Sequence, residues 1–298
     1  MSAVVIINPV AGGRRRGPSV DERVRLVRAA LTRHGAEGRV VVTERAGHGR
    51  ELARQAVEDG ADVVVAWGGD GTINEVASQL VGSASALGIV RAGSGNGLAR
   101  ELGIPRAPEA ALDVALAGHE RRIDVGEIEG RPFLNVAGVG FDAAMAIAFN
   151  GLGGERRGSA RYALRVLREA FGYQARRYTI DVDGLRVETD ALVVAVANLP
   201  QYGSNAVIAP TAMPDDGLLD IVVVEDRGTL ARIGLAPRLF DRSLDRADGV
   251  SILKGTRVSI AGSAPTAFHV DGEPCAGGAS VSARIHPAAL RVKVPRGA

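Results

Sequence analysis

A glycine-rich segment, Gly68-Gly69-Asp70-Gly71-Thr72, carries the residues best suited to phosphate chemistry. Glycine lets the backbone approach a ligand closely, and free N–H groups at the start of a helix attract anions. The carboxylate in this segment would repel a phosphate unless it holds a metal ion or accepts a proton. The segment therefore predicts a site where phosphate and metal meet. The alternative is a tight turn between a strand and a helix, with the aspartate as its cap.

A second glycine-rich segment runs from Gly93 to Gly97 and includes Ser94 and Asn96. Leu98 follows it, so the G-x-G-x-x-G fingerprint of dinucleotide-binding proteins is not completed. No Gly-Lys pair occurs in the chain, which excludes a Walker A loop. Phosphoryl transfer would then rely on backbone amides, arginines and a metal ion. Together the two segments predict two walls of one nucleotide site.

Carboxylates cluster at two places in the second half of the chain. Asp215, Asp216 and Asp220 lie within six residues, and hard cations such as magnesium prefer such oxygens. Asp271 and Glu273 flank a glycine, and one of them could act as general base for a hydroxyl group. A solvated turn at the first place and an ordinary hairpin turn at the second are the alternatives.

The stretch 156–177 interleaves arginines with apolar residues. A basic amphipathic helix of this kind can rest on an anionic membrane surface. The alternative is a helix that packs on its own domain and keeps its arginines in solvent.

Length and composition limit the class of protein. A chain of 298 residues predicts about two domains, and its net charge of +2 does not indicate a nucleic-acid partner. Cys275 is the single cysteine, so no intrachain disulfide can form, which fits a reducing cytoplasm. The apolar run at the N-terminus is too short for a signal peptide, and no stretch of about 20 apolar residues predicts a membrane span. We expect a cytoplasmic protein.

The elements that must position the glycine segments alternate between strand and helix. The apolar patterns predict strands at 4–7, 39–43, 62–67 and 87–90 and helices at 20–33, 49–59 and 73–81. This order predicts an α/β domain with a mainly parallel sheet. Ligands of such sheets bind beyond the carboxyl ends of the strands, where both glycine segments fall.

The second half of the chain has a different pattern. It predicts short strands at 178–182, 192–197, 219–224, 257–260, 267–270 and 290–294, with helices at 161–171 and 230–240. Asp183-Gly184 between two apolar runs predicts a hairpin. We expect an α/β domain over 1–125 and a β-rich sandwich domain over 126–298, with the last strand a candidate to return to the first domain.

The ordered set of motifs resembles the diacylglycerol kinase catalytic-domain family, which includes bacterial soluble lipid kinases and the sphingosine and ceramide kinases. The motifs that carry this resemblance are Asn8-Pro9 with Gly12-Gly13, Gly68 to Val76, Gly93 to Arg100, Gly138 to Ala143, Asp215 to Asp220, and Asp271 to Glu273. NAD kinases and phosphofructokinases share the Gly-Gly-Asp-Gly element. Arg91, Ser94 and Gly97 depart from the residues frequent in bacterial diacylglycerol kinases and are closer to the sphingosine and ceramide kinases.

The resemblance implies an ATP-dependent, magnesium-requiring lipid kinase with a phosphofructokinase-like first domain. The nucleotide-binding residues that it implies are Asn8, Thr43, Gly68, Gly69, Asp70, Gly71, Thr72, Asn74, Ser94 and Asn96. Asp216 would bind magnesium with the carbonyl groups of Met213 and Leu218. Asp271 or Glu273 would be the base, and Asp70 would organise magnesium and the phosphates, with proton acceptance as its second role.

The expected reaction transfers the γ-phosphate of ATP to the hydroxyl of a lipid such as diacylglycerol or a sphingoid base. The expected partners are that lipid, a membrane surface contacted transiently, and a second copy of the chain in a homodimer. Two rival functions remain open at this point. One is a NAD kinase-like small-molecule kinase, and the other is a catalytically silent regulator that binds lipid or nucleotide.

Overall fold

The computed structural model describes residues 1–12, 18–93, 95–150, 172–203 and 205–297. The chain divides into two compact units. Unit 1 comprises Met1–Ile123 and Ala288–Ala298, and unit 2 comprises Asp124–Pro287. The chain passes from one unit to the other within strand β5 (His119–Ile128) and again within strand β17 (Ser280–Val294).

Unit 1 is built on a parallel sheet with the strand order β2-β1-β3-β4, and β17 pairs beside β4 in the same direction. These strands are β1 (Ser2–Ile7), β2 (Glu37–Val42), β3 (Val63–Gly68) and β4 (Ala86–Arg91). The helices are α1 (Val20–Arg33), α2 (His48–Glu58), α3 (Asp70–Leu80), α4 (Gly97–Glu101) and α5 (Pro108–Ala117).

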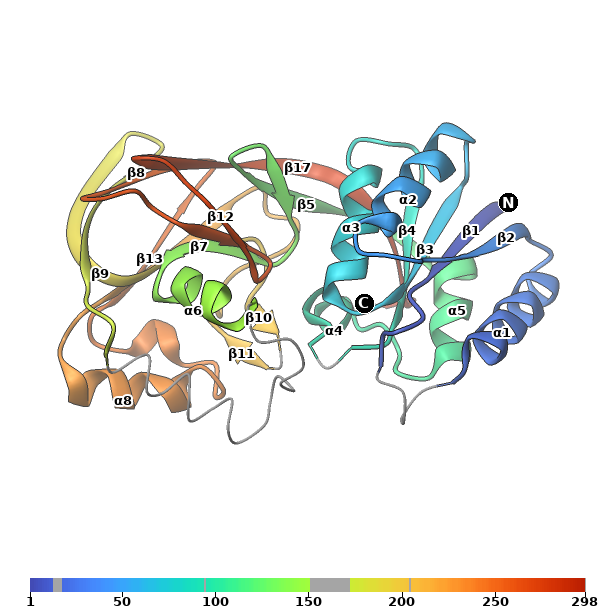
Figure 1. Cartoon of the computed structure of the whole chain (residues 1–298), viewed down its shortest axis with the longest axis horizontal. Helices are drawn as coiled ribbons and strands as arrows, with labels where there is room; N and C mark the ends of the chain where they lie inside the picture. Colours follow the sequence, from blue (N-terminus) through green and yellow to red (C-terminus); the bar gives the residue numbers. More distant parts are fainter. Residues whose placement is uncertain (13–17, 94, 151–171, 204, 298) are drawn as a thin grey trace. The chain divides into compact units, whose positions relative to one another are not determined.

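Helices cover both faces of this sheet (Figure 1). Helix α1 packs against α5, and α2 packs against α3. Because β3 is covered on both faces, all six of its residues are buried, which explains its continuous apolar sequence. Helix α5 lies close to β4, since a Cβ atom at Gly88 would be 2.7 Å from the Cβ of Ala115.

Unit 2 is made mainly of antiparallel strands. They are β5 in part, β6 (Arg131–Phe133), β7 (Val136–Gly140), β8 (Arg176–Val182), β9 (Leu185–Ala197), β10 (Gln201–Gly203), β11 (Ala206–Val207), β12 (Leu219–Glu225), β13 (Val250–Gly255), β14 (Arg257–Gly262), β15 (Phe268–Val270), β16 (Glu273–Cys275) and β17 in part. Strand pairing runs β16-β15-β7-β9-β8-β14-β17, and β12 pairs with both β9 and β13. The helices in the described part of unit 2 are α6 (Phe141–Asn150), α8 (Thr229–Arg238) and the 3-10 turn η1 (Leu244–Arg246).

Strands β9 and β12 separate two apolar cores in unit 2. Val194 and Ile221 belong to the larger core, which lies between strands of the sandwich. Ala195 and Val222 point to the opposite face and join a second core against which Leu235 of α8 packs. Side chains of successive residues in a strand point to opposite faces, so both faces of β12 and of the second half of β9 are apolar and largely buried.

The predicted architecture of a parallel α/β part followed by a β-sandwich is confirmed. The hairpin predicted at Asp183-Gly184 is confirmed as well, because Val182 pairs with Leu185 across it. Both turn residues have positive φ, +49° and +92°, as a two-residue turn of this type requires.

Several element boundaries were predicted wrongly. Helix α3 begins at Asp70 and not at residue 73, because Gly69 is its N-cap and the glycine segment forms its first turn. Strands β9 and β17 are much longer than predicted. The first half of β9 is mostly exposed and is held by pairing with β8. The first half of β17 alternates exposed and buried residues and pairs with β14. The predicted helix at 161–171 lies outside the described residues. In the described parts of the chain, no helix has the length and apolar character needed to cross a membrane.

Candidate functional site

The two glycine segments meet at the carboxyl edge of the sheet in unit 1. Gly68 pairs with Arg91 at the ends of β3 and β4, and the segments follow directly. A Cβ atom added at Gly93 would be 3.0 Å from the Cα of Gly69, so the two backbones are in contact. The close approach favours glycine at position 93, whereas a Cβ atom at Gly69 would make an ordinary contact, 3.7 Å from the Cα of Gly93.

Asp70 ties the two segments together. Its two carboxylate oxygens accept the backbone N–H groups of Asn96 at 2.7 Å and of Gly97 at 2.8 Å. A Cβ atom at Gly95 would collide with this carboxylate, which explains the glycine at that position. Asp70 therefore fixes the position of the second glycine segment relative to the first. Its roles toward magnesium and as proton acceptor stay predictions.

The start of helix α3 presents unpaired amides. The first hydrogen bond within the helix runs from Ile73 N–H to Gly69 O at 3.0 Å. The N–H groups of Asp70, Gly71 and Thr72 come before it and have no acceptor inside the helix. Among the described residues, none would touch a Cβ atom at Gly71 within 4 Å, so this turn faces open space. Such a helix start favours a phosphate group.

Asn8 connects the end of β1 to this helix start. Its side-chain amide donates to the hydroxyl of Thr72 at 2.8 Å, and its side-chain oxygen accepts Val10 N–H at 3.1 Å. Arg23 fixes the loop after β1, because its guanidinium donates to Asn8 O and Ala11 O, both at 2.8 Å. Only 4% of Arg23 is exposed, and burial lowers the pKa of its guanidinium. Sequence analysis missed Arg23, since α1 otherwise reads as an ordinary amphipathic helix.

Thr43 and Asn74 also lie near this edge in the chain. Thr43 follows β2 and is buried, with its N–H donated to Ile7 O at 2.9 Å. Asn74 lies in the second turn of α3. Its neighbour Glu75 accepts Gly47 N–H at 2.9 Å and so fixes the loop before α2. Ser94 lies outside the described residues.

Positive charge gathers beside the second glycine segment, where Arg106 and Arg100 repel Arg91. Arg91 ends β4, and its Nε atom is buried with no hydrogen-bond partner among the described residues. Burial, and then repulsion from Arg106 and Arg100, lowers the pKa of Arg91. An anion bound here would relieve both costs.

In unit 2, Asp271 and Glu273 lie on the turn between β15 and β16. The carboxylate of Asp271 accepts three backbone N–H groups, from Leu134 at 2.9 Å, Asn135 at 2.9 Å and Val136 at 3.1 Å. Glu273 is exposed, and no described residue donates a hydrogen bond to its carboxylate. Of the two, Glu273 has the carboxylate that is available to a substrate.

Lys254 is paired with Asp216, the one carboxylate among the predicted magnesium ligands. Asp216 accepts Leu218 N–H at 3.1 Å and the ammonium of Lys254 at 3.0 Å, and the same ammonium lies 3.2 Å from Asp220. Burial is the largest single influence on the pKa of Lys254 and lowers it, but hydrogen bonding and attraction from the two carboxylates together outweigh burial and raise the pKa. Met213 is half-exposed beside them. The Lys254 ammonium already neutralises Asp216 and Asp220, so these carboxylates as placed do not fit a divalent ion. In the described parts of the chain, no three His, Cys, Asp or Glu side chains form a metal-binding group.

Comparison with known proteins agrees with this arrangement. Residues 2–128 match the family model described as "Diacylglycerol kinase catalytic domain", and residues 135–294 match "YegS C-terminal NAD kinase beta sandwich-like domain". The chain is 33% identical over 284 residues to "Probable lipid kinase YegS-like" of Chromohalobacter salexigens, covering 94% of this chain and 90% of the relative.

Two solved structures share the fold. A crystal structure of a diacylglycerol kinase from Bacillus anthracis str. Sterne has a TM-score of 0.76 at 19% identity, covering 99% of this chain and 97% of the other. An NAD kinase from Archaeoglobus fulgidus in complex with ATP has a TM-score of 0.56 at 14% identity, covering 99% and 94%. The family models and the 33% identity carry the assignment: the chain belongs to the family of YegS-like lipid kinases with a diacylglycerol kinase catalytic domain.

Proposed function

We propose that this protein transfers the γ-phosphate of ATP to the hydroxyl group of a lipid such as diacylglycerol or a sphingoid base. The observation that carries the proposal is the contact between the two glycine segments, tied by Asp70 beside the open start of α3. Backbone amides there suit the phosphates of a nucleotide, and the positive charge of Arg91 at the end of β4 adds to the attraction.

The nucleotide residues in this proposal are Asn8, Thr43, the segment 68–74, Ser94 and Asn96. The related fold of an NAD kinase with bound ATP supports ATP as the donor. Magnesium bound to the ATP phosphates would supply charge neutralisation. The structure does not favour Asp216 as a ligand of a second magnesium ion, and no step of the reaction depends on it.

Glu273 is the proposed general base. The lipid hydroxyl oxygen forms a bond to the γ-phosphorus while the bond from that phosphorus to the bridging oxygen of ADP breaks. The hydroxyl proton passes to the Glu273 carboxylate, and ADP leaves with the electron pair. Positioning and charge neutralisation account for most of the rate in such reactions, so the base contributes a smaller share.

The proposed setting is the cytoplasm with transient contact at a membrane surface, where a lipid hydroxyl is accessible. The basic stretch 156–177 would be the contacting segment, and most of it lies outside the described residues. A homodimer stays a prediction, and light scattering on the purified protein would test it.

The decisive experiment incubates the protein with labelled ATP, magnesium and a total lipid extract, with NAD in a parallel reaction. The proposal expects label in a lipid and none in NAD. Label in NAD alone would establish the NAD kinase-like function instead. Lipid binding without any transfer would establish a regulator.

A further inference from the structure

A largely buried polar cluster in unit 2 joins three separate elements. It consists of Asp142 in the first turn of α6, His269 in β15 and Tyr202 in β10. Both the Tyr202 hydroxyl and the Nε2 atom of His269 lie 3.0 Å from the same oxygen of Asp142. His269 is only 2% exposed. Polar side chains placed this deeply are costly unless they are fully paired, so the cluster calls for an explanation.

The hydrogen bonds define which nitrogen of His269 carries the proton. The backbone N–H of Gly272 points at Nδ1, 3.3 Å away. A backbone N–H can only donate, so Nδ1 must be the acceptor and a neutral ring must carry its proton on Nε2. Nε2–H then donates to Asp142, which therefore selects the form of His269 that can hold Gly272.

This link reaches the turn that carries the proposed base. Asp271 and Gly272 are the two turn residues, with φ of +48° and +85°, and Glu273 follows as the first residue of β16. Asp271 is fixed through its carboxylate by the backbone of residues 134–136. Gly272 is fixed through His269. Both turn residues are therefore anchored to buried groups immediately before Glu273.

We propose that Asp142 and His269 are positioning residues for the Glu273 carboxylate, acting through the Asp142–His269–Gly272 hydrogen-bond chain. The inference rests on the proposed role of Glu273. A residue that only stabilised the fold would not depend on which nitrogen of His269 carries the proton. The proposed positioning role requires the proton on Nε2.

Two substitutions interrupt the chain at different points. Asp142→Asn keeps the size. Its amide oxygen stays with the backbone N–H of Ala143, which can only donate and which Asp142 already accepts at 2.8 Å. The NH₂ group then faces Nε2, so His269 is driven to protonate Nδ1 and loses Gly272. His269→Gln retains a donor that can reach Asp142 and removes the acceptor for Gly272. Tyr202→Phe removes only the second donor to Asp142 and leaves the chain intact. The matched control is His286→Gln, because His286 pairs with Glu127 at 3.1 Å in unit 2 near the surface.

The test measures kcat and KM for ATP in the lipid-kinase assay, and the ¹⁵N signals of the His269 ring. We expect wild-type His269 to be protonated on Nε2, and Asp142→Asn and His269→Gln each to lower kcat by on the order of tenfold with KM for ATP unchanged. Tyr202→Phe and His286→Gln should retain kcat. In a Glu273→Gln background, neither substitution at 142 or 269 should lower kcat further.

Three results would overturn the proposal: a wild-type His269 protonated on Nδ1, substitutions that lower only the melting temperature, or further losses in the Glu273→Gln background. If the wild type phosphorylates no lipid, the proposed function fails separately. Amide exchange at Gly272 then decides, since faster exchange in Asp142→Asn but not in Tyr202→Phe supports the anchoring, and equal exchange refutes it.

Discussion

The carboxylate of Asp70 accepts the backbone N–H of Gly97 at 2.8 Å, across a sequence separation of 27 residues. Its other oxygen accepts Asn96 N–H, so a single side chain aligns the start of α3 with the start of α4. The Cα atom of Gly69 lies against Gly93 in the same place. The conformation of one glycine segment therefore depends on the other.

Replacement of Asp70 by alanine should weaken nucleotide binding more than it weakens the fold. The substitution removes two hydrogen bonds to a charged acceptor, and we expect a loss of about 2 kcal/mol in ATP binding. Titration calorimetry with ATP measures this directly. Asp59→Ala is the control, because Asp59 makes an exposed ion pair with Arg39 in the same unit. Equal ATP affinity of the Asp70 variant and the wild type would show that the hydrogen bonds from Asn96 and Gly97 to Asp70 do not shape the nucleotide site.

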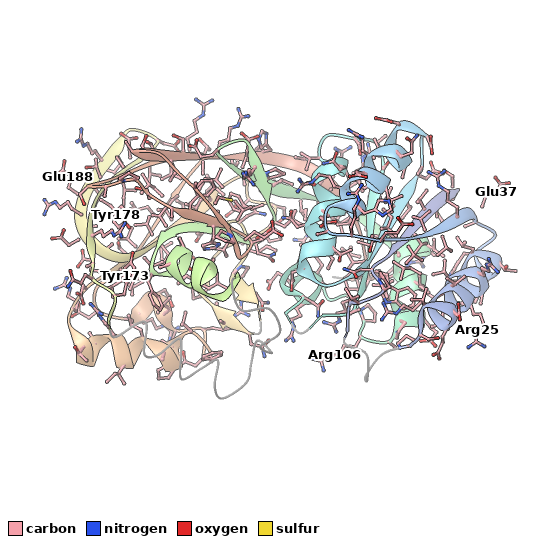
Figure 2. All side chains as sticks on the ribbon, in the orientation of Figure 1. Arg25, Glu37, Arg106, Tyr173, Tyr178 and Glu188 are labelled. Carbon is pink, nitrogen blue, oxygen red and sulfur yellow. The ribbon has the colours of Figure 1, made fainter. Side chains whose placement is uncertain are left out.

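Arg23→Lys should destabilise unit 1 and loosen the loop after β1. Lysine cannot reproduce the planar fork that donates to Pro18 O, Asn8 O and Ala11 O. We expect a loss of about 2 kcal/mol in the free energy of unfolding, measured with urea. Arg25→Lys is the matched control, since Arg25 projects from the outer side of the same helix (Figure 2). A loss of the same size in both variants would refute the assignment.

The sequence was most informative where chemistry and local backbone conformation coincide. The segment 68–72 was predictable because a glycine-rich run between an apolar strand and a helix has few other uses. The hairpin at Asp183-Gly184 was predictable for the same reason, since two adjacent positive φ angles favour those residue types.

Contacts between distant residues were not predictable in this way. His269 and Asp142 are separated by 127 positions, and Lys254 and Asp216 by 38. Neither pair produces a local pattern, so no sequence signal indicated the His269–Asp142 contact, and the aspartates at 215–220 were expected to bind a metal ion. Strand lengths failed for a related reason, because half of β9 is exposed and is held by its partner β8. Pairing with a neighbouring strand stabilises a strand whose own sequence has no strand-like apolar pattern.

The contribution of Asp226 to stability should disappear in acid. Hydrogen bonding from Arg232 is the main cause of its lowered pKa, and the pair is partly buried. An unfolded aspartate has a pKa of about 3.9, so the stabilisation is complete above that value and is lost as the pH falls through the lower folded pKa. Wild type should exceed Asp226→Asn by about 1 kcal/mol at pH 7, and the difference should shrink below about pH 4.

Urea unfolding of both proteins from pH 7 to pH 3 measures this difference. Asp190→Asn serves as the control, because Asp190 is exposed and lies 3.6 Å from Arg177. A difference between wild type and Asp226→Asn that stays constant over the whole range would show that the ion pair is not its origin.

Asp271 and Glu273 should separate cleanly into a structural and a catalytic residue. Asp271→Asn replaces one acceptor oxygen with a donor facing backbone N–H groups, so unfolding should become easier by about 2 kcal/mol. Glu273→Gln removes no described hydrogen bond and should leave the melting temperature unchanged. Its kcat should fall by about 10²-fold or more if the carboxylate takes the proton. Full activity in Glu273→Gln would exclude it as the base.

Lys254→Met should make the carboxylates of Asp216 and Asp220 bind a cation that they do not bind in the wild-type protein. The side chain of Asp220 is only 1% exposed, and it would lose the ammonium at 3.2 Å that balances its charge. We expect the variant to be less stable by about 2 kcal/mol, a value reduced because Lys254 is itself partly exposed. Millimolar MgCl₂ should raise the melting temperature of the variant and leave that of the wild type unchanged, both without nucleotide. Lys293→Met, which alters the other lysine of the chain, is the control, since Lys293 lies 3.9 Å from Glu120 in unit 1. A wild-type melting temperature that rises equally with magnesium would show that the loop around Asp216 binds the ion despite the lysine.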